Sequence, residues 1–223
     1  FCKKVCFGHN RLSIIDLSNR ASQPFVSSDE KYTITFNGEI YNYKELKIEL
    51  TKKNIRFKSN SDTEVLLESY KYWGIQFVNK LRGMFAFAIW DDVRKELILA
   101  RDPFGIKPLY FSKKNGILYF ASQVKSILSI NNLSFKKSGK SVIDYYLWGN
   151  VQEPFTLYED IYSINRGTIK IFDRNCNEKK YEYAQLKETI IKSEKDYFRT
   201  TSALNEKLNY IISKTVNYHQ VSD

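Results

Sequence analysis

Five residues within the first 62 positions carry the groups that a binding site for a small zwitterion needs. Arg11 provides a guanidinium, and Glu39 and Asp62 provide carboxylates. Asn37 and Gly38 place a side-chain amide next to a backbone N–H. An arginine fork suits an α-carboxylate, a carboxylate suits an α-ammonium, and paired N–H donors suit a carbonyl oxygen whose carbon is attacked. Free glutamine has all of these groups, so the set fits glutamine.

Each of these residues also has an ordinary structural explanation. Arg11 on its own is most simply a surface arginine. Asn37-Gly38 is the commonest dipeptide of short hairpin turns, and Asp62 stands where a helix is expected to begin and could cap it. The glutamine hypothesis therefore rests on the ordered set rather than on any one residue.

The pattern of apolar residues predicts the elements that would position this set. Residues 31–36 alternate apolar and polar side chains, which predicts a half-buried strand that stops at Asn37-Gly38. Residues 43–53 are rich in Glu, Lys and Leu, which favours a helix. Ser61 and Glu64 form a capping-box pattern before a second helix, which Gly74 ends.

Apolar runs later in the chain predict a layered structure. Strands are expected at residues 84–90, 96–100, 108–111, 117–121 and, as the last strand, 168–172. The first of these runs is apolar on both faces, which indicates that both faces are covered. The connections are short, which favours antiparallel pairing. We therefore expect an α+β fold with sheet packed on sheet, then a polar linker over 175–201 and an amphipathic helix from Leu204 to Thr215.

The composition argues against several classes of protein. The net charge is +10, but the lysine pairs are scattered and no RNA-binding motif or zinc-finger spacing accompanies them, so no nucleic-acid partner is expected. No apolar run of ~18 residues is present, so no membrane span is expected. Three cysteines are too few and too odd in number for a disulfide scaffold, which favours the cytoplasm, and no metal site is expected. The first residue, Phe1, is not a methionine, which indicates a fragment.

Longer motifs carry a resemblance to a known family. The chain resembles, over nearly its whole length, the class II glutamine amidotransferase domain of glutamine-hydrolysing asparagine synthetases. The segments that carry the resemblance are residues 8–18, 23–24, 37–42, 61–64, 82–88, 101–110 and 120–122. Other class II amidotransferases have a tryptophan-containing segment where this chain has Arg11-Leu12-Ser13, so they are the weaker match.

The resemblance implies an N-terminal-nucleophile hydrolase fold, a four-layer αββα sandwich with stacked antiparallel sheets. The residues it assigns to glutamine are Arg11, Leu12, Ser13, Ile14, Ile15, Asn37, Gly38, Glu39 and Asp62. In that assignment the guanidinium holds the α-carboxylate, the two carboxylates hold the amino end, and the amide pair holds the oxyanion. In that family an amino-terminal cysteine is the nucleophile, and the released ammonia reaches a second domain that uses ATP to convert aspartate to asparagine.

The chain departs from the family pattern at both ends. Phe1 blocks the amine of Cys2, and eight residues separate Cys2 from Arg11, so Cys2 is not expected to be the nucleophile. We expect residues 1–175 to be an amidotransferase domain truncated at its amino end. Residues 176–223 would be a linker and the first helix of a missing synthetase domain. ATP and Mg would belong to that domain, no cofactor is expected here, and the resemblance also allows a homodimer.

These observations leave more than one hypothesis for function. The first is the glutamine-binding domain of an asparagine synthetase, inactive in the form given because it lacks the nucleophile. The second is a non-catalytic glutamine-binding regulatory module. The third is an amidotransferase that acts on another carboxylate, in surface-sugar or antibiotic synthesis. Because the missing domain would choose the acceptor, the sequence does not discriminate among acceptors.

Overall fold

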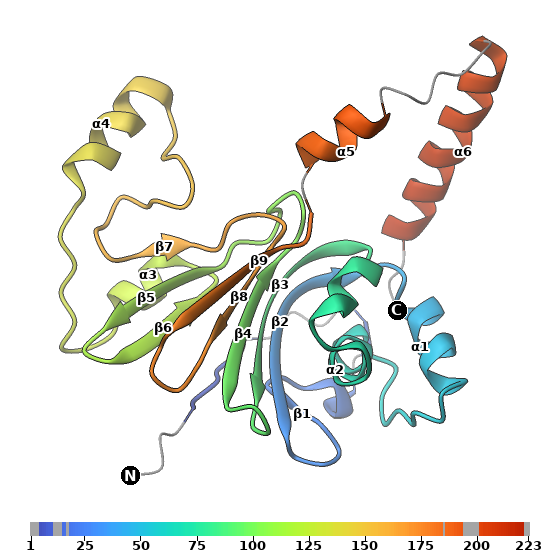
Figure 1. Ribbon diagram of the computed structural model, residues 1–223, viewed down its shortest axis with the longest axis horizontal. Helices are drawn as coiled ribbons and strands as arrows, with labels where there is room; N and C mark the ends of the chain where they lie inside the picture. Colours follow the sequence, from blue (N-terminus) through green and yellow to red (C-terminus); the bar gives the residue numbers. More distant parts are fainter. Residues whose placement is uncertain (1–4, 11–14, 17, 185, 194–200, 221–223) are drawn as a thin grey trace.

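Antiparallel β-sheets stacked face to face form the centre of the molecule (Figure 1). The computed structural model describes residues 5–10, 15–16, 18–184, 186–193 and 201–220. Within these residues, a six-stranded sheet has the order β1-β2-β3-β4-β8-β9, and a three-stranded sheet has the order β6-β5-β7. The strands are β1 (Phe25–Val26), β2 (Tyr32–Ile40), β3 (Gly83–Asp91), β4 (Glu96–Arg101), β5 (Tyr110–Lys114), β6 (Ile117–Ala121), β7 (Tyr162–Ser163), β8 (Thr168–Phe172) and β9 (Glu178–Glu182).

Helices flank the sheets unequally. The α-helices are α1 (Tyr43–Thr51), α2 (Asp62–Trp73), α3 (Val124–Leu128), α4 (Gly139–Trp148), α5 (Leu186–Ser193) and α6 (Thr201–His219), and the 3-10 helices are η1 (Asn19–Ala21) and η2 (Gly74–Lys80). Figure 1 shows α2 beside β2 and α1 on the far side of α2, whereas α4 stands apart beyond the smaller sheet. The short α3 contacts β5 and β6. No helix in the described part of the chain combines the length and apolarity that a bilayer crossing requires.

Apolar side chains on the two faces of β3 divide the core into two layers. Phe85, Phe87 and Ile89 pack with buried residues of α1 and α2 in one cluster. Ala86 and Ala88 face the other way and pack with residues of the smaller sheet. The expectation that both faces of this run are covered is therefore confirmed. So is the expected α+β architecture with antiparallel sheets. The complete four-layer order stays a prediction.

The predicted strand end at Asn37-Gly38 is wrong. Strand β2 continues through this dipeptide to Ile40 and pairs antiparallel with β3, so that Asn37 lies opposite Ala86 and Gly38 opposite Phe85. Gly38 has a φ of +147°, and a Cβ there would lie 2.8 Å from the Phe85 Cα and collide with the Met84 carbonyl oxygen. The glycine is therefore needed for close approach of two strands, not for a turn.

Two further expectations are corrected in detail. Ser61 caps α2 by accepting the Thr63 N–H at 3.1 Å, but Glu64 turns to the N–H groups of Lys58 and Ser59 instead of closing a capping box. The last strand is not 168–172, because β9 pairs with β8 at the edge of the sheet. Every residue of β9 is exposed, so it lacks the apolar alternation by which a strand is recognised. The division at residue 175 stays a prediction.

The close approach at Gly38 gives a stability prediction. Replacing Gly38 with Ala should destabilise the fold more than replacing Gly116, because Gly116 also has a positive φ but has nothing near its missing Cβ. We expect the Gly38→Ala loss to exceed the Gly116→Ala loss by at least ~2 kcal/mol, measured by urea unfolding. Equal losses would show that positive φ alone, not the contact between β2 and β3, requires the glycine.

Candidate functional site

Most of the predicted site residues that the structure describes meet at one small cavity. Its volume is about 160 Å³, well below the ~300–1,000 Å³ of pockets for drug-sized ligands, so it suits a molecule of amino-acid size. The residues that line it are His9, Asn10, Ile15, Gln23, Phe36, Asn37, Gly38, Glu39, Asp62, Thr63, Met84 and Lys107. Of the predicted residues, Arg11, Leu12, Ser13 and Ile14 lie outside the described residues.

Asp62 joins the start of α2 to the end of β2. It is the first residue of the helix, and its Oδ2 accepts the Ile40 N–H at 3.1 Å. Its side chain is buried, and this burial raises its pKa to about 6, although the hydrogen bonds from Ile40 and Thr63 oppose the shift. The negative charge of Glu39 raises the pKa further. A cation bound beside Asp62 would favour its ionised form and so oppose the effects of burial and of Glu39.

Glu39 presents a carboxylate oxygen that the fold does not use. Its Oε1 is buried and has no hydrogen-bond partner among the described residues. Burial raises the pKa of Glu39, while electrostatic interactions with His219 and Lys107 act to lower it. A buried carboxylate oxygen without a donor is costly, and an ammonium group in the cavity would satisfy it.

The amide pair lies on the same wall of the cavity. The Asn37 side chain is exposed, and no hydrogen bond from it to a described residue is formed, so both amide hydrogens are available to a ligand. Gly38 allows the backbone of β2 to run close to β3 at this point. The cavity thus combines hydrogen-bond donors with two carboxylates, which is the arrangement that a zwitterion with a distal carbonyl requires.

Sequence reasoning missed several residues of the cavity. Gln23 braces the wall, because its Oε1 accepts the Phe36 N–H at 2.6 Å and its Nε2 donates to the Thr63 Oγ1 at 3.3 Å. His9 approaches the same strand, with its Nε2 3.1 Å from the Phe36 carbonyl oxygen. Gln23, Thr63 and His9 all fall within the motifs quoted for the family resemblance, so that signal was present but unassigned. Lys107 reaches the cavity from a distant loop.

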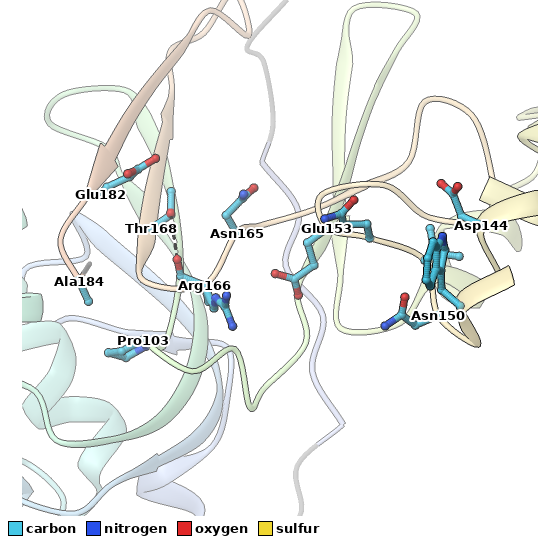
Figure 2. Close-up of a pocket in the computed structure, with 12 residues that line it drawn as sticks. Pro103, Asp144, Asn150, Glu153, Asn165, Arg166, Thr168, Glu182 and Ala184 are labelled. Atoms are coloured by element: carbon cyan, nitrogen blue, oxygen red, sulfur yellow. Dashed lines mark hydrogen bonds between the residues drawn. The ribbon is translucent and has the colours of Figure 1, made fainter. Parts of the chain in front are cut away.

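A second, larger hollow is lined by a different set of residues. It has a volume of about 1210 Å³ and is lined by Pro103, Asp144, Trp148, Asn150, Val151, Gln152, Glu153, Asn165, Arg166, Thr168, Glu182 and Ala184. Figure 2 shows Asn165 and Arg166 near β8 and β9, with Asp144 and Asn150 far across the hollow beside α4. None of the residues predicted to bind glutamine lines it. The smaller cavity is therefore the candidate site.

Comparison with known proteins also points to glutamine as the ligand of this family of domains. Residues 1–184 match the family described as glutamine amidotransferase domain. The chain is 41% identical over 222 residues to asparagine synthetase [glutamine-hydrolyzing] 1 of Bacillus subtilis, which covers 98% of this chain and 33% of that protein. It is 37% identical over 182 residues to amidase chry2 of Gibberella zeae, covering 82% of this chain and 26% of that protein. The chain thus spans about a third or less of the length of these relatives.

Solved structures show the same fold at low identity. A glutamine phosphoribosylpyrophosphate amidotransferase from B. subtilis, complexed with ADP and GMP, matches with a TM-score of 0.51 and 23% identity. The match covers 75% of this chain and 33% of that one. A structure described as the allosteric regulatory enzyme of purine biosynthesis matches with a TM-score of 0.50, also at 23% identity, over 73% of this chain and 31% of that one. At 23% identity, these two likenesses show the fold alone.

The raised pKa of Asp62 predicts a dependence of stability on pH. Below the ordinary value of 3.8 the carboxyl is protonated in both folded and unfolded chains. As the pH rises from 3.8 to about 6, the unfolded chain releases this proton and the folded chain keeps it, so the wild type loses stability. Asparagine cannot ionise. The Asp62→Asn variant should therefore gain about 3 kcal/mol relative to the wild type across this interval, at ~1.4 kcal/mol per pKa unit.

Urea unfolding of both chains at several pH values between 4 and 7 would measure this difference. The comparison uses the change with pH, so a constant effect of the lost carboxylate on the Ile40 hydrogen bond cancels. A stability difference that stays the same across the interval would mean that Asp62 is ionised in the folded chain throughout.

Proposed function

The chain belongs to the glutamine amidotransferase domain family, and we propose that its small cavity binds free L-glutamine as the nitrogen donor of an amidation. The observation that carries the proposal is the meeting of Asn37, Gly38, Glu39 and Asp62 at one cavity of amino-acid size. These residues come from one strand and the start of one helix, and they offer carboxylates to the α-ammonium and N–H donors to the distal amide of glutamine.

Each group of the ligand would have a partner. The α-ammonium lies between Glu39 and Asp62, where it satisfies the unpartnered Oε1 and lowers the cost of two neighbouring buried carboxylates. Arg11 would hold the α-carboxylate, and Leu12, Ser13, Ile14 and Ile15 are the further contacts that the family resemblance implies. Asn37 and the Gly38 N–H face the distal amide and stabilise the oxyanion that forms when its carbon is attacked.

The chemistry proposed for the intact site is amide hydrolysis through a thioester. The thiolate of an amino-terminal cysteine attacks the distal amide carbon and the C–N bond breaks. The amide nitrogen takes up the proton that the thiol lost and leaves as ammonia. Water then attacks the thioester, which releases glutamate and restores the thiol. No cysteine among the described residues lines the cavity, and Phe1 precedes Cys2 in the sequence, so we propose that a polypeptide of these 223 residues binds glutamine without hydrolysing it.

The acceptor of the ammonia is proposed from the relatives. The similarity to an asparagine synthetase of B. subtilis favours aspartate, activated by ATP and Mg in a part of the protein outside this domain. Amidase chry2, a relative of similar identity, is not named as an asparagine synthetase, so an amidotransferase that acts on another carboxylate is the other candidate. Both candidates use the same glutamine cavity. A non-catalytic glutamine-binding module would also bind glutamine, but it would not gain activity when an amino-terminal cysteine is supplied.

Glutamine binding gives the first test. L-Glutamine at 100 times its dissociation constant should stabilise the folded chain by about 2.7 kcal/mol, seen as a higher melting temperature. Glu39→Gln keeps the size of the side chain but removes the charge that would hold the α-ammonium. This variant should lose most of the stabilisation.

The controls separate binding from general effects. Glu159→Gln removes a carboxylate from an exposed position that does not line the cavity, and its response to glutamine should equal that of the wild type. L-Asparagine is one methylene shorter and should stabilise the chain less. If glutamine leaves the melting temperature of the wild type unchanged, the proposed function is wrong.

The oxyanion role of Asn37 gives a kinetic test. In a form of the protein that carries an amino-terminal cysteine, Asn37→Ala should lower the kcat of glutamine hydrolysis by a factor on the order of 10²–10³, because one donor to the oxyanion is lost. The KM for glutamine should change little, since the donor acts mainly in the transition state. A rise in KM with an unchanged kcat would assign Asn37 to ground-state binding instead.

A further inference from the structure

The backbone of Lys107 is held from both sides by the last residue of β4 and the residue after it. The Asp102 Oδ2 accepts the Lys107 N–H at 3.1 Å. The Arg101 Nε donates to the Lys107 carbonyl oxygen at 2.9 Å. Both side chains that make these bonds are buried. Removing a guanidinium and a carboxylate from water is costly, so a loop backbone held by two buried charges is fixed for a reason.

Asp102 organises the whole loop between β4 and β5. Its carboxylate also accepts the N–H groups of Phe104 and Ile106, at 2.9 and 3.1 Å. It accepts the Phe85 N–H on β3 at 3.3 Å, next to the cavity residue Met84. One fully buried carboxylate therefore ties this loop to the strand that forms part of the glutamine cavity.

Arg101 extends the same network towards the larger hollow. Its Nη2 donates to the Gly105 carbonyl oxygen at 2.7 Å, and its Nη1 donates to Ile164 O at 2.9 Å. The Nη1 also forms an ion pair with the Glu153 Oε1 at 2.6 Å. Glu153 lines the larger hollow and is labelled in Figure 2. A chain of direct contacts thus runs from Glu153 through Arg101 to Lys107.

The Lys107 side chain has no hydrogen bond or ion pair to a described residue, although it lines the glutamine cavity. Its charge acts on Glu39. Burial raises the pKa of Glu39, and the interactions with His219 and Lys107 lower it. Lys107 therefore lies near the carboxylate that the proposed function assigns to the amino end of glutamine. The α-carboxylate of an amino acid is bonded to the same carbon as its α-ammonium, so a cation beside Glu39 meets that end of the ligand.

We propose that Lys107 is a substrate-binding residue that contacts the α-carboxylate of glutamine and selects ligands in which this group is free. The inference rests on the proposed function and deepens it, since it adds a cation to a site for which Arg11 was the predicted partner of the α-carboxylate. Asp102 and Arg101 are positioning residues that fix the Lys107 backbone, and Glu153 supports Arg101.

The test compares two ligands with the full 223-residue chain by calorimetry. L-Glutamine has a free α-carboxylate, and L-glutaminamide has a neutral amide in its place. Lys107→Met keeps the length of the side chain and removes its charge. The variant should bind glutamine about 10- to 100-fold more weakly, the range for one lost charge-assisted hydrogen bond, and should bind glutaminamide as well as or better than the wild type does.

Lys125→Met on the exposed face of α3 is the matched control and should bind both ligands as the wild type does. Equal losses for both ligands in Lys107→Met, or no loss for glutamine, would overturn the inference while leaving the proposed function intact. Absence of glutamine binding by the wild type would instead overturn the proposed function, and the inference with it.

A double-mutant comparison tests the positioning network. Glu153→Gln removes a half-exposed carboxylate, so the variant should fold, but Arg101 loses its ion-pair partner. It should weaken glutamine binding severalfold and leave glutaminamide binding unchanged. If Glu153 acts through Lys107, its effect on glutamine should vanish in the Lys107→Met background. Additive effects of the two substitutions would show that Glu153 does not act through Lys107.

Discussion

The close pairing of β2 with β3 is the constraint on which the site depends. Glycines on both strands make it feasible, because a Cβ at Gly38 would meet the Met84 carbonyl oxygen and a Cβ at Gly83 would meet the Glu39 carbonyl oxygen. The pairing keeps β2 extended as far as Ile40, and the Ile40 N–H then bonds Asp62 on α2. A turn in place of this strand end would separate the amide pair from the carboxylates. The backbone contact therefore determines where the polar groups meet.

Two buried carboxylates at the cavity lower the stability of the folded chain. Burial raises the pKa of Asp62 and Glu39, and one oxygen of Glu39 has no donor among the described residues. Such groups lower the stability of the folded chain and are therefore typical of positions kept for a ligand. A zwitterion that brings an ammonium group supplies what the cavity lacks.

Buried charges also hold the loop that completes the cavity. Asp102 is fully buried, and its carboxylate accepts hydrogen bonds from the backbone N–H groups of four residues. The Arg101 guanidinium donates to backbone carbonyl oxygens and forms an ion pair with Glu153. Saturating each charge with hydrogen bonds offsets the cost of burying it. The result is a loop with a defined backbone rather than a mobile connection. Arg101 also connects this loop to the larger hollow, because its ion-pair partner Glu153 lines that hollow.

The amino-acid pattern by itself predicted the helices found at 43–51 and 62–73, most strands of the core and the residue types proposed for the site. Those features depend on local periodicity and on residue types, which a sequence displays directly. Tertiary structure decided the rest. Asn37-Gly38 has the composition of a turn, and only its neighbour β3 makes it part of a strand. The edge strand β9 has no apolar face, and only its hydrogen bonds to β8 define it. Lys107 joins the cavity because a buried ionic network folds its loop back onto β3, and contacts between residues so far apart leave no periodic trace in the sequence.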